Sequence, residues 1–489
     1  MRHGPHSDDL GATKQPRHPL RRLRCGRRRA AAHVECRPAA PMAPPTTPTP
    51  PAAAAPSAPV WGLPTLAAAL AAWAFALGRR SAVPSEDGVS YLWMAERFAA
   101  GDFAAATGTV FPVGYPLLLA PWCALGLGPE LAAHLVGALA LAATLWPLRT
   151  LAHALGGDAA GRAAVLLFAA VPLLPRLAAE CYSEPPFLLL MAHGAVAALR
   201  GRWALVGLCA AAAFWIRPEG SLLAASYALA APRAAWRALP PVAVGVLALA
   251  ALRWACGHGF DPLPIHAFHQ QRDDLPEQGR VLANLLATPG PWLEAFALAG
   301  VLCLPQLRWR DRLRLPLLLQ IALQVGVVAT FVVRRRFFLS CAIPVCALAG
   351  AQLAALPVAW RRGLLAAALA LGAWSGWNGG IDADRAVERD LGLWLRPRVA
   401  GGQPLVSDLP RVVWFVGQRP LPPRHHTAAQ MQALVAAAAP AFVVVRTRSA
   451  RAAFAGYERW LRERYAPVEL PAALAAAAAS RGIAVFARR

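Results

Sequence analysis

Charged residues are scarce in this sequence, and lysine is nearly missing. Only 15% of the 489 residues carry a charged side chain, and Lys14 is the single lysine. Hydrophobic residues make up 57% of the chain, the mean hydropathy is +0.41, and long apolar runs recur along it. One water-soluble core cannot hold so much apolar surface, which excludes an ordinary soluble globular protein. The sequence therefore predicts an α-helical, multi-spanning membrane protein.

Acidic residues are also few, so the formal net charge reaches +23. An excess of this size is common in nucleic-acid-binding proteins. Here, however, the arginines fall into short clusters between apolar runs, where basic residues set the orientation of membrane spans. We therefore expect membrane lipids, and no nucleic acid, among the partners.

Paired cysteines are lacking as well. Of the nine cysteines, two lie in the first 60 residues, the others lie in or beside apolar runs, and none follows Cys346. This arrangement offers no framework of the kind that stabilises small secreted domains, so we expect no structural disulfides.

Residues 1–60 can neither hold a helix nor build a core. They join a basic segment, "RHPLRRLRCGRRR", to the proline-rich segment "MAPPTTPTPPAAAAP". We expect a disordered cytoplasmic tail.

Residues 61–378 are predicted to form the transmembrane domain, with about eleven spans of about 20 residues or fewer. The predicted spans are 61–78, 131–149, 163–178, 185–199, 203–216, 219–232, 240–256, 289–306, 314–333, 337–357 and 363–378. In this register five basic links lie on the cytoplasmic side, at Arg149 with Arg162, Arg200 with Arg202, Arg233 with Arg237, "RWRDRLR" (308–314), and Arg361 with Arg362. The proline-broken run at 112–128 is expected to be re-entrant or interfacial, since a further crossing would put all five links outside.

The outward loops of this register are 79–130, 176–184 and 256–288. They hold nearly every acid and histidine in the middle of the chain, so we expect the chemistry on the outer face. Residues 379–489 are more polar and contain two β-like runs, "PLVSDLPRVVWFVG" and "AFVVVR", then helix-like "FAGYERWLRERY" and a closing "GIAVFA". They predict a small α/β domain on the extracytoplasmic side.

Several motifs resemble those of C-class membrane glycosyltransferases. Asp87 precedes Tyr91 by four residues and is followed by "WMAERFAAGDF", a pattern similar to the first outer loop of that family. The further motifs, in order, are "FPVGYPLLLAPWCALG", "YSEPPFLLLMAHGAVAAL", "AAFWIRPEGSLL", "GFDPLP" and "RRRFFLSCAIPVCALAG". The likeness runs from about residue 60 to residue 430, and it is greatest to the protein O-mannosyltransferase and lipid A aminoarabinose-transferase group.

The resemblance implies a transferase that takes a sugar from a polyprenyl-phosphate donor. The acceptor would be a hydroxyl of a glycan, lipid or protein on the outer face of the inner (plasma) membrane. A divalent metal is left open by the resemblance.

Asp87 is the expected catalytic base. The transfer needs a carboxylate to take the proton of the acceptor hydroxyl, and the resemblance places the family's carboxylate in this loop. Glu86 is the alternative in a shifted alignment. A second interpretation makes Asp87 a solvated loop acid or the N-cap of a helix that starts at Val89.

Two acids of the second outer loop, Glu180 and Glu184, are further site candidates. The resemblance implies that a second acid accompanies the first. Glu184, before Pro185, also fits an ordinary helix start with proline in the first turn.

Arg334, Arg335 and Arg336 lie at the outer end of a predicted span, against the usual distribution of basic residues. Three arginines there indicate an anionic partner, and arginine binds phosphate through two parallel hydrogen bonds. The resemblance favours Arg336 as the contact to the donor phosphate, with Arg335 beside it. The other interpretation is that these side chains reach the lipid headgroups.

Arg217 lies at a break between two apolar runs and suits either a donor-phosphate pocket or a structural pair with Glu219. His258, Asp261, His266 and His269 match no zinc spacing, so no metal ligands are assigned. Asp382 and Asp384 are expected to cap a helix, and His425 and His426 to lie on a surface.

Two other function classes stay open. A transporter or flippase for a lipid-linked sugar would share the lipid-facing arginines, but such proteins usually carry an internal repeat, and we detect none. A glycan polymerase or ligase that uses a lipid diphosphate would depend on arginines and need the loop aspartate less.

Overall fold

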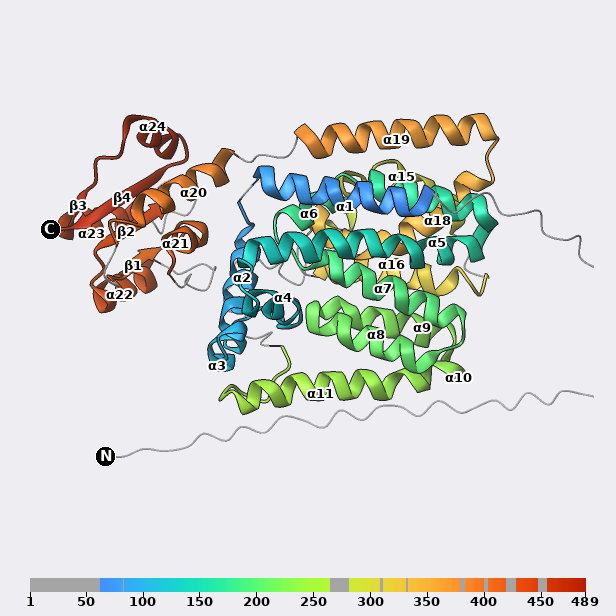
Figure 1. Cartoon of the computed structure of the whole chain (residues 1–489). Coiled ribbons are helices and arrows are strands. Elements are labelled where there is room, and N and C mark those ends of the chain that lie inside the picture. The colour runs from blue at the N-terminus through green and yellow to red at the C-terminus, as the bar shows by residue number, and fades with distance from the viewer. Residues whose placement is uncertain are drawn as a thin grey trace, which may run out of the picture. The chain divides into compact units, whose positions relative to one another are not determined.

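The computed structural model describes most of the chain after the N-terminal segment. The described ranges are 62–81, 83–263, 281–307, 311–330, 333–378, 383–399, 403–418, 428–446 and 455–489. Several predictions lie outside them, namely the tail 1–60, His266, His269, Asp382, His425 and His426. Residues 59–489 form one compact unit, in which the helices of the apolar runs precede a small sheet (Figure 1).

The apolar runs fold into a helical body, which we define as residues 62–378. In chain order its helices are α1 (Gly62–Ser81), α2 (Glu86–Ala99), α3 (Phe103–Thr107), α4 (Gly114–Ala124), α5 (Pro129–Ala170), α6 (Leu173–Ala179), α7 (Glu184–Leu199), α8 (Trp203–Ile216), η1 (Pro218–Gly220), α9 (Ser221–Ala230), α10 (Pro232–Ala235), η2 (Trp236–Ala238), α11 (Leu239–Ala255), α13 (Val281–Ala287), α14 (Pro289–Phe296), α15 (Leu298–Leu302), η4 (Leu304–Gln306), α16 (Leu315–Thr330), α17 (Arg335–Phe338), η5 (Leu339–Cys341), α18 (Ala342–Ala354) and α19 (Val358–Asn378).

The long helix α5 is a hairpin of two arms. Gly156 and Gly157 leave the helical conformation, and Gly157 has a φ of 76°, which glycine adopts readily. Gly161, after the break, lies against Arg149, before it, so the chain folds back on itself. The predicted spans 131–149 and 163–178 therefore correspond to the two arms, with α6 continuing the second.

Four helical segments among the described residues are long and apolar enough to cross a membrane. They are Gly62–Arg80, Pro129–Ala170, Trp236–Ala255 and Arg335–Ala354. Three shorter apolar helices, α7, α8 and α16, coincide with predicted spans but have 14 to 16 residues, or about 21–24 Å at 1.5 Å per residue. The run 289–306 is broken at Ala297 into short helices, so the number of eleven spans stays a prediction.

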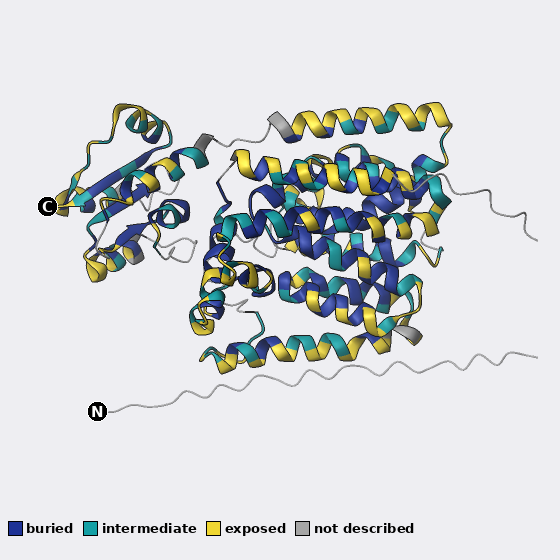
Figure 2. Cartoon of the chain, in the orientation of Figure 1, coloured by how far each residue is buried: buried dark blue, intermediate teal, exposed yellow. Residues whose placement is uncertain are grey.

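The outermost helices of the body carry exposed apolar side chains, whereas the central ones are buried (Figure 2). On α11 these include Val244 and Leu247, and on α19 Leu371 and Trp374. By contrast, α18 is buried along nearly its whole length. An apolar outer surface around a packed centre is the arrangement that lipid contact requires.

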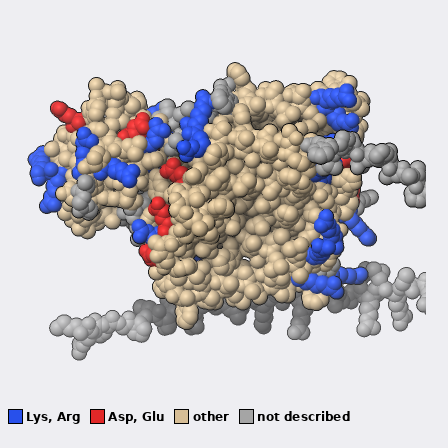
Figure 3. All heavy atoms as spheres, viewed as in Figure 1, with Lys and Arg blue, Asp and Glu red and all other residues tan. Residues whose placement is uncertain are grey.

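The helical body has a basic end and an acidic end. Successive helices run back and forth along it, so the α5 turn and the α7–α8 and α18–α19 links meet at the end far from the C-terminal residues (Figure 1). Arginines gather at that end in the space-filling view, and acids lie near the opposite end (Figure 3). At the acidic end α2 crosses the ends of the other helices, next to the short α4. Which end faces the cytoplasm stays a prediction.

The C-terminal region, residues 383–489, contains a four-stranded sheet between two layers of helices. Its elements are α20 (Ala383–Leu395), β1 (Leu405–Ser407), α21 (Pro410–Val416), α22 (Ala428–Ala438), β2 (Phe442–Arg446), α23 (Ala455–Arg464), β3 (Tyr465–Pro467), α24 (Ala472–Ser480) and β4 (Ile483–Arg488). The strand order is β1-β2-β4-β3, with β1 parallel to β2 and the other pairs antiparallel. Alternate residues of β2 face opposite layers, so Val444 packs with α20 and α21, and Val443 with α22 and α23.

One of the two β-like runs predicted in the C-terminal region is a strand only in its first half. The run "PLVSDLPRVVWFVG" contains the short β1, but its second half is the helix α21. Pro410 suits the first turn of a helix, and Gly417, with a φ of 88°, ends it in the left-handed conformation. A short apolar run does not by itself distinguish a strand from a buried helix.

Asp408, which follows β1, is predicted to make stability depend on pH. The backbone N–H of Arg446 donates to its carboxylate at 3.2 Å, and burial raises the pKa of Asp408 to about 6. Since an unfolded Asp has a pKa of about 3.9, the folded state binds the proton more tightly, and stability falls as the pH rises from about 4 through 6. In Asp408→Asn the thermal unfolding midpoint should decrease less between about pH 4 and pH 6 than in the wild type. In Asp390→Asn, at an exposed position of α20, it should decrease as in the wild type. An unchanged pH profile in Asp408→Asn would contradict the assignment.

Candidate active site

Asp87 and Arg336 meet at the acidic end of the helical body. Arg336, at the start of α17, donates through Nη2 to Asp87 Oδ2 at 2.5 Å, across 249 residues of sequence. Both side chains are largely buried, with 16% of Asp87 and 20% of Arg336 exposed. The residues that the sequence nominates as base and phosphate contact are thus ion-paired with each other.

The start of α2 determines where the Asp87 carboxylate lies. The helix begins at Glu86, and Ser85 is its N-cap, since the Gly88 N–H donates to Ser85 Oγ at 2.9 Å. The alternative interpretation of Asp87 as the N-cap of a helix starting at Val89 is therefore wrong. Its carboxylate lies in the first helical turn, where the helix dipole stabilises negative charge.

Aromatic rings enclose the guanidinium of Arg336. The rings of Tyr182 and Phe337 each lie 4.9 Å from it, within the range of cation–π attraction. Tyr182 belongs to the loop between α6 and α7, so this loop contributes directly to the site. Arg335 lies apart, half exposed and 3.9 Å from the carboxylate of Glu294.

Arg217 is held by two carboxylates. Its Nη1 donates to Glu184 at 2.7 Å and its Nη2 to Glu219 at 2.8 Å. Glu184 is 1% exposed and begins α7, while Arg217 directly follows α8. The local partner Glu219 is the one that the sequence suggests, whereas Glu184 is a partner from a different helix.

The Glu184–Arg217 pair should contribute strongly to stability. Removing one member of a buried pair typically costs about 3–5 kcal/mol, because the other charge stays buried. Glu184→Gln should therefore lower the thermal unfolding midpoint, and adding Arg217→Met together with Glu219→Gln, so that no carboxylate loses its partner, should recover most of the loss. Arg200→Gln, at the exposed far end of α7, is the matched control. A Glu184→Gln protein as stable as the wild type would show that the pair is not structural.

Glu180 and Glu86 bind arginines other than Arg336. Glu180 pairs with Arg385 of α20 at 2.6 Å and with Arg176 at 3.4 Å. Glu86, 44% exposed, lies 3.7 Å from Arg411 of α21. Both acids therefore connect loop segments of the helical body to the C-terminal region.

Tyr91 lies between the two ion pairs, and sequence reasoning used it only for its spacing. Its hydroxyl is 3.5 Å from Ser183 Oγ. Burial raises the pKa of Tyr91, and the nearby charge of Asp87 raises it further. The hydroxyl therefore stays protonated and can donate a hydrogen bond.

Among the described residues, no three His, Cys, Asp or Glu side chains gather as metal ligands. His258 binds the carbonyl of Ala104 at 2.9 Å, and Asp261 accepts from the Leu263 N–H at 2.9 Å. His258 thus connects the segment after α11 to α3, whereas Asp261 makes a contact within its own loop.

The fold of this chain is similar to the folds of several solved proteins. ArnT from Cupriavidus metallidurans bound to undecaprenyl phosphate matches with a TM-score of 0.57 and 14% identity, over 88% of this chain and 98% of that one. The apo state of ArnT gives 0.59 and 15% identity, over 87% and 97%. The archaeal oligosaccharyltransferase AglB from Archaeoglobus fulgidus, in complex with an inhibitory peptide and a dolichol-phosphate, gives 0.52 and 10% identity, over 82% and 71%.

No family model matches the sequence, and no curated protein matches it. At identities of 10–15% the likeness shows the fold. The chain therefore has the fold shared by ArnT and AglB, as the sequence resemblance predicted.

Proposed function

We propose that this chain is a membrane glycosyltransferase that moves a sugar from a polyprenyl-phosphate donor to an acceptor hydroxyl on the outer face of the inner membrane. The observation that carries the proposal is the buried contact between Asp87 and Arg336. It brings a carboxylate and a phosphate-binding cation to one end of a helical body whose fold is shared with proteins solved with undecaprenyl phosphate and dolichol-phosphate.

In the proposed reaction, the donor phosphate separates the pair. Arg336 turns its guanidinium from Asp87 to the phosphate oxygens, where two parallel hydrogen bonds replace one carboxylate contact. The rings of Tyr182 and Phe337 keep the guanidinium at this place. Asp87 is thereby released as a base beside the bound phosphate.

The chemical step is a single inverting displacement. The acceptor oxygen bonds to the anomeric carbon, its proton passes to the Asp87 carboxylate, and the bond from that carbon to the phosphate oxygen breaks. The electron pair of the broken bond stays on the phosphate, where Arg336 stabilises the charge. The products are the glycosylated acceptor and polyprenyl phosphate.

The remaining candidates receive supporting roles. Arg335 is exposed enough to meet the donor phosphate as it arrives from the membrane. Arg217 is already neutralised by two carboxylates, so we propose that it acts with Glu184 in shaping the site and meets phosphate only if a carboxylate moves away. Glu180 and Glu86 hold the loops instead of reacting.

The proposal is tested with a panel of radiolabelled polyprenyl-phosphate sugars. Purified protein in vesicles is incubated with each donor and with membrane extract as the source of acceptor. Transfer of label from one donor is the expected result and identifies the sugar. No transfer from any donor, combined with protein-dependent movement of intact labelled lipid across the bilayer, would favour the flippase interpretation.

A further inference from the structure

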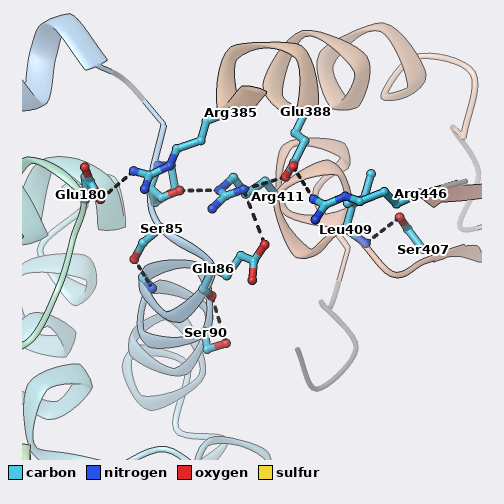
Figure 4. A network of polar contacts seen from close by, with 12 residues as sticks. Ser85, Glu86, Ser90, Glu180, Arg385, Glu388, Ser407, Leu409, Arg411 and Arg446 are labelled. Carbon is cyan, nitrogen blue, oxygen red and sulfur yellow. Dashed lines mark hydrogen bonds and ion pairs between the residues drawn. The ribbon is translucent and has the colours of Figure 1, made fainter. Parts of the chain in front are cut away.

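Arg411 of α21 holds the segment that directly precedes Asp87. Its Nε donates to the carbonyl of Pro84 at 2.8 Å, and its Nη1 donates to Glu388 of α20 at 2.8 Å (Figure 4). The same Nη1 lies 3.7 Å from Glu86. Arg411 is 8% exposed and Glu388 2%, so water competes little for these contacts.

Glu388 orients the guanidinium. Its second oxygen accepts from Arg446 at 3.0 Å, so the carboxylate is held between two arginines of the C-terminal region. A buried carboxylate fixed on both sides gives Arg411 one preferred direction, toward Pro84.

A second set of contacts holds the same segment from the other side. Ser85 donates its N–H to the carbonyl of Glu180 at 3.0 Å, and the Glu180 carboxylate pairs with Arg385 of α20. Gly88 packs so closely on that carbonyl that a Cβ there would lie 2.7 Å from it. Residues 84 to 88, which include Asp87, are therefore held on both sides by groups tied to the C-terminal region.

We propose that Arg411, oriented by Glu388, is a positioning residue for Asp87. It sets the start of α2 through the Pro84 carbonyl and so keeps the carboxylate opposite Arg336. The inference rests on the proposed function, in which Asp87 is the base. It gives the C-terminal region a part in the reaction through the backbone of the first outer loop.

The kinetic test compares Arg411→Ala and Arg411→Lys with the wild type. A misplacement of about 1 Å can cost about 100-fold in rate, so Arg411→Ala should lower kcat by about ten- to 100-fold and change the donor KM by less than about twofold. Arg411→Lys should recover part of kcat, because an ammonium group can donate to Pro84 or Glu388 but cannot contact both as the planar guanidinium does. The control is Arg459→Ala, at an exposed position of α23 in the same region.

A second readout does not require transfer. Hydrogen exchange of a peptide covering residues 83–90, measured on the full chain without donor or acceptor, should become faster in Arg411→Ala and stay unchanged in Arg459→Ala. In Arg411→Ala, hydrogen exchange in residues 383–446 of the C-terminal region should stay as in the wild type. A wild type that transfers no sugar would therefore refute the proposed function, while the exchange result still decides whether Arg411 holds this segment.

Three outcomes would overturn the inference. The first is wild-type kcat with wild-type exchange at residues 83–90 in Arg411→Ala. The second is faster exchange spread over the C-terminal region, which would make Arg411 a folding residue of that region alone. The third is a change in donor KM with kcat unchanged. If Arg411→Ala does not fold, the same measurements on Arg411→Lys and Glu388→Gln decide between these results.

Discussion

Asp87→Asn is expected to reduce sugar transfer by about 10²- to 10⁴-fold, the usual contribution of a general base. The amide has the size of the carboxylate but cannot take the proton of the acceptor hydroxyl. Donor binding should persist, because loss of the carboxylate frees Arg336 for the phosphate. The measurement is the initial rate of label transfer at saturating donor, beside donor binding by the same protein.

Two further variants show whether this effect is specific to Asp87. Glu96→Gln removes an exposed acid from the same helix, α2, and should leave the rate unchanged. Glu86→Gln tests the shifted alignment and should affect the rate far less than Asp87→Asn, since Glu86 faces Arg411. Full activity of Asp87→Asn, or loss of activity only in Glu86→Gln, would show that Asp87 is not the base.

Arg336→Ala is expected to weaken donor binding by about 30-fold or more, because losing one partner of a buried charged contact typically costs about 2–5 kcal/mol. Arg336→Lys should recover only part of the affinity, since an ammonium cannot make the paired contacts of a guanidinium. Binding of polyprenyl phosphate can be followed by native mass spectrometry in detergent, which needs no sugar and no acceptor.

The matched control for Arg336 is Arg362→Ala. Arg362 is an exposed arginine in the same helical body, near the start of α19 and at the basic end. Arg362→Ala should leave the affinity for polyprenyl phosphate unchanged if the phosphate site is local to Arg336. It should lower that affinity as much as Arg336→Ala does if the arginines act only through the net charge. Unchanged affinity in Arg336→Ala would place the phosphate elsewhere.

Much of the helical body was predictable, because its apolar runs begin and end at polar or helix-breaking residues. The predicted spans 185–199 and 203–216 match α7 and α8 to within one residue. Basic residues between these runs also indicated which links share one end. The α5 turn at Gly156 and Gly157 lies within the predicted link between spans 131–149 and 163–178, but the two helical arms continue into that link further than predicted. The apolar second half of the β1 run was mistaken for a strand.

The partners within the site could not be predicted from the sequence. Asp87 and Arg336 were nominated separately, but nothing in the chain indicates that residues 249 positions apart share an ion pair. Glu184 as a partner of Arg217 was missed for the same reason. Arg411 and Glu388 lie in the C-terminal region, where the sequence pattern predicted only strands and helices. Contacts between distant segments depend on tertiary packing, which one sequence without its relatives does not record.

The most direct test of the account counts both products of one reaction. Vesicles with the wild-type protein, a radiolabelled polyprenyl-phosphate sugar and acceptor are sampled over time for label on the acceptor and for free polyprenyl phosphate. We predict that the two appear in equal amounts and that both are lost in Asp87→Asn. Labelled lipid that reaches the opposite leaflet intact, with no polyprenyl phosphate released, would contradict the account and indicate a transporter.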